Sequence, residues 1–290
     1  MNDYIIFTDS TTDLTPDMIT TLEVQVMSLT YSMNNKTYKN TPDHSDMDIK
    51  IFYDNLRNGD TATTAQINPS DMVRVFEPVL QDGNDILYIA FSSGLSGTYQ
   101  SACIAAKELN QQYPNHTVKV VDSLAASMGE GLLLYLAVMK KREGLNITQL
   151  KQWVTDNRNH LCHWFTVDDL HHLKRGGRVS AGAAVIGSAL NIKPVMHMDN
   201  DGHLIPVRKV RGRKQSLTAL VTQMEQTALS KGSQDVFISH ADCINDAKFV
   251  EQLVLEKFPQ ARITINFIGP VIGAHSGPGT VALFFLGTEK

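Results

Sequence analysis

The feature that most constrains this chain is an apolar run that passes through a glycine- and serine-rich turn into an alanine-rich segment. Residues 86–90 are apolar and predict a buried strand, and residues 101–109 predict a helix. The turn between them, residues 91–100, leads to a helix start with unpaired backbone N–H groups and the positive end of the helix dipole. Together with its hydroxyl groups, this turn is expected to cradle an anion.

Strands and helices alternate along the first half of the chain. Further strands are predicted at residues 4–8, 24–31 and 118–121, and helices from Pro16 and at residues 49–56, 71–80 (capped by Ser70) and 125–142. Polar turns follow three strands: Asp9-Ser10, Ser92-Ser93 and Asp122-Ser123. Ligands bind at the carboxyl edge of open parallel sheets. The pattern predicts an α/β fold whose N-terminal part is a mainly parallel, Rossmann-like sheet with flanking helices.

The second half of the chain predicts a C-terminal α/β unit with a mixed sheet. Strands are expected at residues 164–167, 192–198, 204–210, 236–239, 263–268 and 281–286, and helices at 181–190, 212–230 and 246–258. Asn200-Asp201-Gly202 is a strong hairpin signal. Residues 61–69 and 269–279 are predicted as loops. Because 290 residues suffice for two cores, we expect an N-terminal domain at 1–157, carrying the cradle, and a C-terminal domain at 158–290.

Composition excludes several classes of protein. The net charge of −4 argues against a nucleic-acid partner. The three cysteines are scattered, which suits a reducing compartment without a disulfide framework. The chain begins without a recognisable leader pattern, and its longest apolar run is too short for a membrane span. We therefore expect a cytoplasmic protein whose contact with membranes is at most transient.

The cradle at residues 92–98 matches no familiar catalytic motif. A hydrolase elbow requires Gly-x-Ser-x-Gly, but in Gly94-Leu95-Ser96-Gly97-Thr98 the second glycine comes one residue early. No lysine follows as in a P-loop, and the glycine spacing does not fit a dinucleotide site. A tight strand-to-helix turn with serine capping is the alternative to an anion site.

Basic residues and histidines supply further candidates. Arg175-Gly176-Gly177-Arg178 places two guanidinium groups on a glycine-rich turn, which suits bidentate binding of a carboxylate or phosphate, or is a solvated basic turn. The run at residues 208–214 is read as a solvated face. His275 lies among glycines that let backbone approach a ligand closely, with a structural histidine as the alternative.

A metal site is not expected. The histidines and cysteine that invite one do not follow a standard zinc spacing: His160, Cys162, His163, His171 and His172. No cofactor is expected either.

Taken in order, the motifs resemble one family. They are Asp9-Ser10-Thr11, Thr64-Ala65-Gln66, residues 92–102, Asp122-Ser123, residues 173–180, Lys193-Pro194, residues 211–214 and residues 269–279. The chain is similar along nearly its whole length to the DegV family of bacterial fatty-acid-binding proteins, the FakB component of fatty acid kinase. The family usually reads Thr-Ser-Gln-Pro in the threonine loop, where this chain has Ala65 and Ile67 in place of the serine and proline.

The resemblance implies a two-domain α/β protein that binds one long-chain fatty acid. It would present the carboxylate to a partner kinase for ATP-dependent phosphorylation to an acyl-phosphate, which an acyltransferase could use in phospholipid synthesis. The family's carboxylate-binding residues fall on Thr64, Ser96 and His275, and its phosphoryl-transfer arginines on Arg178 and Arg211. The residues that would support the cradle are Asp9, Ser10, Ser92, Ser93, Gly94, Gly97 and Thr98.

Two other functions stay open. A serine hydrolase would need Ser96 within hydrogen-bond reach of His275 and a carboxylate behind that histidine. A sensor of another small anion, such as a phosphorylated metabolite, would use the same cradle. Because the chain has no P-loop and no kinase signature, phosphorylation would belong to the partner, and we expect a binding protein rather than an enzyme.

Overall fold

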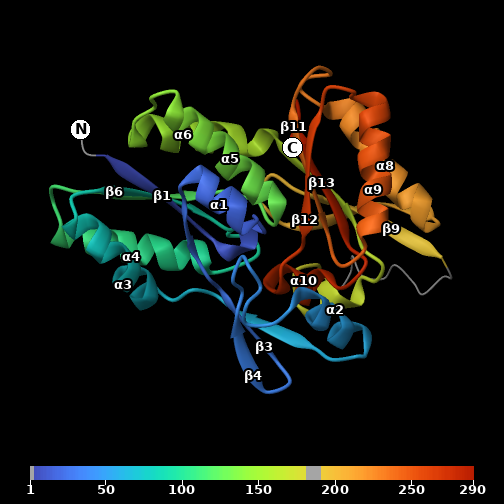
Figure 1. Ribbon diagram of the computed structural model, residues 1–290, viewed down its shortest axis with the longest axis horizontal. Coiled ribbons are helices and arrows are strands. Elements are labelled where there is room, and N and C mark those ends of the chain that lie inside the picture. Colours follow the sequence, from blue (N-terminus) through green and yellow to red (C-terminus); the bar gives the residue numbers. More distant parts are fainter. Residues whose placement is uncertain (1–2, 181–190) are drawn as a thin grey trace.

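The computed structural model describes residues 3–180 and 191–290, and the helix predicted at 181–190 lies outside the described residues. The described residues fold as α/β and contain three sheets (Figure 1). A parallel sheet and a mixed sheet lie side by side, and a small third sheet lies beneath them in the view of Figure 1. The predicted fold class is confirmed.

The first sheet is parallel throughout. Its strands are β1 (Tyr4–Asp9), β2 (Gln25–Met27), β6 (Asp85–Ala90) and β7 (Val118–Asp122), in the order β2-β1-β6-β7. Every residue of β6 is buried, as expected for a strand covered on both faces. Parallel pairing brings the ends of β1, β6 and β7 to one edge, so the three predicted polar turns do converge.

Helices cover both faces of this sheet: α1 (Pro16–Leu22), α3 (Pro69–Gln81), α4 (Thr98–Gln112), α5 (Met128–Arg142) and α6 (Ile147–Asn157). Helices α3 and α4 pack against one face, and α1, α5 and α6 against the other (Figure 1). The prediction that Ser70 caps α3 is wrong. Asn68 is the cap, because its side chain accepts a hydrogen bond from the backbone N of Asp71 at 2.9 Å.

The second sheet is mixed, as predicted. Its strands are β8 (Leu161–Thr166), β9 (Ile192–Met198), β10 (Leu204–Arg211), β11 (Asp235–His240), β12 (Arg262–Phe267) and β13 (Val281–Leu286), in the order β10-β9-β8-β13-β11-β12. Only β11 and β12 pair in parallel. The predicted hairpin joins β9 and β10, and α8 (Arg213–Thr227) and α9 (Ile244–Lys257) cover the outer face.

The third sheet contains two departures from the sequence predictions. Its strands are β3 (Thr30–Met33), β4 (Lys36–Lys39) and β5 (Ala62–Ala65), in the order β4-β3-β5, with α2 (Ile49–Arg57) against them. The strand predicted at 24–31 is divided between β2 and β3, which belong to different sheets. The loop predicted at 61–69 includes β5, whose four residues are too few and too polar to show a strand period but pair with β3.

The predicted loop at 269–279 is also wrong, because it contains the helix α10 (Pro270–Ser276). Pro270 occupies the first helical turn, where its fixed φ favours a helix. Gly273 is retained inside this helix because a Cβ there would lie 2.6 Å from the Tyr53 hydroxyl. The remaining short elements are α7 (His171–Arg175) and the 3₁₀ turns η1 (Ser10–Thr12) and η2 (Arg158–His160).

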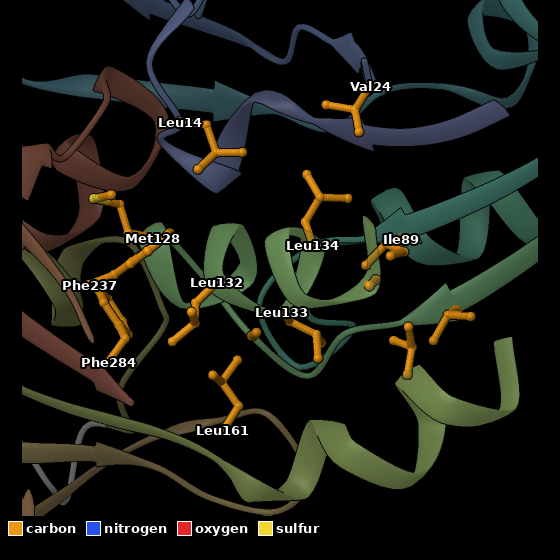
Figure 2. Close-up of a cluster of buried hydrophobic side chains, with 14 of the residues drawn as sticks. Leu14, Val24, Ile89, Met128, Leu132, Leu133, Leu134, Leu161, Phe237 and Phe284 are labelled. Atoms are coloured by element: carbon orange, nitrogen blue, oxygen red, sulfur yellow. The ribbon is translucent and has the colours of Figure 1, made fainter. Parts of the chain in front are cut away.

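The helix α5 forms a core shared by the two larger sheets. Figure 2 shows Leu134 pointing toward Leu14 and Val24 beside β1, and Leu132 pointing toward Leu161 and Phe284 of the mixed sheet. A helix that is apolar on opposite faces must be covered on both. The division of the chain into domains at residue 157 stays a prediction, because this cluster joins the two halves.

Within the part of the chain that the structure describes, no helix is both long enough and apolar enough to cross a membrane. The three cysteines, Cys103, Cys162 and Cys243, are free.

Candidate functional site

A cavity lies between the carboxyl edge of the parallel sheet and the inner face of the mixed sheet, with about 960 Å³ of empty space that includes some open solvent. Most of its wall is apolar, and the larger of these side chains are Leu29, Phe91, Leu95, Phe165, Leu173, Met198, Leu204, Ile268, Val271, Ile272 and Phe284. Such a wall suits an extended apolar ligand, because burying apolar surface is what drives its binding.

The turn between β6 and α4 forms one side of the cavity opening. The Ser96 hydroxyl accepts a hydrogen bond from the backbone N of Thr98 at 3.2 Å and lies 3.0 Å from the Thr98 hydroxyl. Thr98 is buried, whereas Ser96 and Gly97 line the cavity. Gly97, not Ser96, is the N-cap of α4, but the Ser96 hydroxyl still accepts from the first backbone N–H of the helix while it lines the cavity.

Other residues of the predicted cradle hold this turn in place from behind. The Ser92 hydroxyl donates to the carbonyl of Gly202 at 2.9 Å, and the backbone N of Ser93 donates to Asp122 at 3.1 Å. A Cβ on Gly94 would lie 2.7 Å from the Gly202 carbonyl oxygen. Among the described residues that form the cavity wall, Ser92, Ser93 and Gly94 do not appear. Ser92 and Gly94 fix the cradle against the β9–β10 hairpin, and Ser93 fixes it to the end of β7.

The threonine loop approaches the cradle closely at Gly97. A Cβ on Gly97 would lie 2.1 Å from Oε1 of Gln66. The amide of Gln66 also donates to the Ser101 hydroxyl at 3.1 Å. Gln66 therefore helps to position the cradle. It is part of the Thr64-Ala65-Gln66 motif, but sequence patterns did not assign it to the site.

Thr64 and His275 form a hydrogen-bonded pair that also lines the cavity. Oγ1 of Thr64, at the end of β5, lies 2.8 Å from Nε2 of His275 on α10. Burial, with a smaller contribution from Arg178 and Arg175, lowers the pKa of His275 to about 4, so the ring is neutral at neutral pH. In the tautomer that carries its hydrogen on Nε2, the ring donates to Thr64, which leaves the Thr64 hydroxyl to donate to a ligand.

The basic turn, residues 175–178, packs directly against His275. A Cβ on Gly176 would lie 2.1 Å from Nδ1 of His275, so only glycine fits there. Among the described residues, Nδ1 has no hydrogen-bond partner. Gly176 is therefore required by its packing against His275, and Gly177 by its positive φ.

Arg178 contributes the positive charge of the opening. Its Nε donates to the carbonyl of Leu95 at 3.1 Å and its Nη1 to that of Gly176 at 2.6 Å. Burial lowers its pKa from the ordinary value. Arg178 lines both the cavity and an adjoining outer hollow of about 590 Å³, whose other walls include Arg175, Thr64 and His275. We call Thr64, Ser96, Arg178 and His275 the mouth.

The structure does not bring Arg211 to the mouth. Arg211 is exposed at the end of β10, where it pairs with Ile192, and it lines neither the cavity nor the outer hollow among the described residues. Arg213, two residues later, is held in place by hydrogen bonds. Arg213 donates to Asp246 at 2.8 Å and to the carbonyl of Gly279.

Asp9 and Ser10 also act behind the cradle. Asp9 is fully buried and accepts hydrogen bonds from the Tyr88 hydroxyl at 3.0 Å and from the backbone N of Phe91 at 3.1 Å. Burial raises its pKa. Ser10 accepts from the backbone N of Leu29 at 3.0 Å. Both residues organise the turns that surround the cavity rather than its wall.

The hydrolase and metal alternatives gain no support from this geometry. In the described part of the chain no hydrogen bond joins Ser96 to His275, and no carboxylate lies behind Nδ1 of that histidine. Nor do the described residues contain a group of three or more His, Cys, Asp or Glu side chains that could hold a metal ion. A catalytic dyad would need Ser96 and His275 to move together.

Comparisons with known proteins identify the family of the chain. The family model described as "Uncharacterised protein, DegV family" matches residues 4–288. A DegV domain-containing protein of Clostridium perfringens is 44% identical over 290 residues, covering 100% of this chain and 99% of the relative.

Solved structures show the same fold. A DegV family protein from Thermus thermophilus, described by its fatty acid binding, has a TM-score of 0.89 at 29% identity, covering 99% of this chain and 100% of that chain. DegV from Bacillus subtilis, described as a fatty acid binding protein, has a TM-score of 0.86 at 26% identity, with 99% and 100% covered. From the full-length family match and these relatives, we conclude that the chain belongs to the DegV family.

Proposed function

We propose that this protein binds one long-chain fatty acid in the cavity, with the carboxylate at the mouth and the acyl chain along the apolar wall. The main support for the proposal is the cavity itself. Its wall is mostly apolar, and its mouth contains two hydroxyls, a neutral histidine and an arginine. The solved relatives that bind fatty acids support it.

The acyl chain would supply most of the affinity. Burial contributes roughly 0.8 kcal/mol per methylene, so a chain of about fifteen carbons contributes on the order of 12 kcal/mol before the costs of association. The hydroxyls of Thr64 and Ser96, with His275 bonded to Thr64, would fix the orientation of the carboxylate. The mouth therefore decides which end of the ligand is presented, while the wall decides how tightly it is held.

The outer hollow suggests how the carboxylate would be used. Arg175 and Arg178 line this hollow, and Thr64 and His275 separate it from the cavity. A separate kinase would bring ATP to this side. A carboxylate oxygen would attack the γ-phosphorus, the bond to the bridging oxygen would break, and acyl-phosphate and ADP would form, with Arg178 beside the transferred group. An acyltransferase that consumes the acyl-phosphate would be a further partner.

Native mass spectrometry of the purified protein tests the binding step. We expect a co-purified long-chain fatty acid, and stoichiometric uptake of added fatty acid after its removal. A protein that stays empty in excess long-chain fatty acid overturns the proposal.

Phosphorylation tests the presentation step. With the kinase and ATP, Arg178→Ala should retain bound fatty acid but lose acyl-phosphate formation by at least about tenfold, because a charge-assisted hydrogen bond to the phosphoryl group is removed. Arg211→Ala is the variant to compare with Arg178→Ala, because Arg211 does not reach the mouth. Equal loss in both would assign Arg211 to kinase docking, and loss of fatty acid from Arg178→Ala would place that arginine in carboxylate binding instead.

A further inference from the structure

The cavity wall carries hydroxyl groups that the proposed function does not use. Ser127 precedes α5, Ser239 lies on β11, Ser276 is the last residue of α10, and all three line the cavity. Their exposed fractions are 4%, 0% and 6%. Hydroxyl groups so deeply buried in an apolar wall need hydrogen-bond partners.

Counting hydrogens shows what Ser239 offers to the cavity. The Ser127 hydroxyl lies 2.6 Å from Oδ2 of Asp13 and 3.1 Å from the Ser239 hydroxyl, and it has one hydrogen for these two contacts. When Ser127 donates to Asp13, Ser239 must donate to Ser127, and Ser239 keeps its lone pairs as acceptors. When Asp13 is protonated and donates, the chain reverses and Ser239 offers its hydrogen instead.

Ser276 offers both a donor and an acceptor. Its hydroxyl is buried and has no hydrogen-bond partner among the described residues. The other polar side chains of this part of the wall are already satisfied. Thr280 donates to the carbonyls of Ser276 and Gly277 at 2.9 Å, and the two ring nitrogens of His163 meet the Leu161 carbonyl at 3.0 Å and the backbone N of Ala126 at 3.4 Å.

We propose that Ser239 and Ser276 form a second polar subsite that binds a hydroxyl group carried on the acyl chain of the fatty acid. A hydroxyl group is both donor and acceptor, so it matches Ser276 and either direction of the Ser239–Ser127–Asp13 chain. The substrate class thus extends to hydroxylated long-chain fatty acids. This inference rests on the proposed function, because it needs the acid in the cavity.

The test measures dissociation constants of delipidated protein for stearic acid and for a series of hydroxystearic acids with the hydroxyl at successive carbons. In a wholly apolar tunnel every hydroxylated acid binds more weakly than stearic acid, since its hydroxyl loses water without gaining a partner. We expect one position, or two adjacent ones, to bind as tightly as stearic acid or more tightly. Hydroxyls elsewhere should weaken binding at least about tenfold.

Substitutions identify the partners. Ser276→Ala and Ser239→Ala should each weaken the favoured hydroxy acid about tenfold and leave stearic acid within about twofold. Ser96→Ala is the control, because a change at the mouth should affect both acids alike. Thermal unfolding without ligand verifies that each variant folds.

The outcomes separate the two proposals. If stearic acid itself does not bind, the proposed function fails. If stearic acid binds but every hydroxy acid is weaker, and Ser276→Ala changes none of the ratios, the subsite holds only water and the inference is wrong. If Ser276→Ala weakens stearic acid as much as the hydroxy acid, Ser276 belongs to the mouth and the inference is also wrong.

Discussion

The mouth of the cavity and the acid cluster behind the β6–α4 turn are both polar, but their hydrogen bonds are completed differently. In the acid cluster, formed by Asp9, Thr11, Tyr88 and Glu130, the carboxylates contact hydroxyls and backbone N–H groups on all sides. At the mouth, Nδ1 of His275 has no partner among the described residues, the Ser96 hydroxyl contacts Thr98, and the Thr64 hydroxyl contacts Nε2 of His275. Polar groups whose hydrogen bonds are all made stabilise a fold, whereas polar groups that lack a hydrogen-bond partner beside a cavity indicate a ligand site.

The acid cluster also shows how buried carboxyls are kept without cations. The single hydrogen of Thr11 is shared between Asp9 and Glu130, and the Thr8 hydroxyl already donates to the Ile89 carbonyl at 3.0 Å. Glu130 must therefore supply a hydrogen itself to bond the Thr8 hydroxyl. Burial, with Asp9 nearby, holds the pKa of Glu130 well above its ordinary value, which agrees with a neutral acid.

The largest effect should come from breaking the acid cluster. Asp9→Ala removes the acceptor for the Tyr88 hydroxyl and for the backbone N–H groups of Thr11 and Phe91. We expect the free energy of unfolding to fall by about 3–5 kcal/mol, since buried donors are left unpaired. Urea unfolding measures this. Unchanged stability combined with lost fatty acid binding would move Asp9 into the ligand site.

Asp13 should give stability a pH dependence. Burial raises its pKa from 3.8 to about 7, so the folded protein binds the proton more tightly than the unfolded chain. This contribution is fully present below pH 3.8 and is lost as pH rises to about 7, with a size up to about 4 kcal/mol. Asp13→Asn keeps an acceptor for the backbone N of Gly269 and removes the titration.

Urea unfolding of the wild type and Asp13→Asn at pH 5 and pH 8 measures this difference. The stability of the variant relative to the wild type should be greater at pH 8 than at pH 5, because the Asp13 contribution is only partly lost at pH 5. An equal difference at both values would show that Asp13 does not titrate in this range.

At the mouth, Gly176→Ala should impair ligand handling more than stability. Gly176 has φ of −73°, which alanine adopts freely, but its Cβ would collide with His275. We expect the displaced ring to weaken fatty acid binding about tenfold, with unfolding changed by about 1 kcal/mol or less. Gly177→Ala is the control, because it meets no atom within 4 Å and reports only the strain of its φ of 72°. Equal losses in both would attribute the effect to the backbone.

The smallest effect should come from Ser96→Ala. One neutral hydrogen bond contributes about 0.5–1.5 kcal/mol, so fatty acid binding should weaken about two- to tenfold while the acyl chain keeps most of the affinity. Acyl-phosphate formation should fall further than binding, because the carboxylate loses its orientation. Titration with fatty acid and the kinase assay measure the two separately. Full transfer activity in Ser96→Ala would remove that serine from the mouth.

Local sequence patterns predicted more of the fold than of the candidate site. Apolar runs predicted β6 and β7, and the polar turns after them predicted a binding edge, because those signals lie within a few neighbouring residues. The strand β5 and the helix α10 were missed for the opposite reason. The stretch at β5 has no strand period of its own, and the glycines around α10 obscure a helix that packs on Tyr53.

The sequence alone determined the α/β class, the parallel and mixed sheets, and the turn that carries Ser96. Only the tertiary structure decided that Thr64 and His275, 211 positions apart, share a hydrogen bond, that Arg178 reaches the mouth, and that Arg211 does not. Local pattern reports which face of an element is apolar, whereas a cavity depends on the packing of many distant elements at once. For the same reason, the hydroxyls of Ser239 and Ser276 give no signal along the chain and become apparent only in the cavity wall.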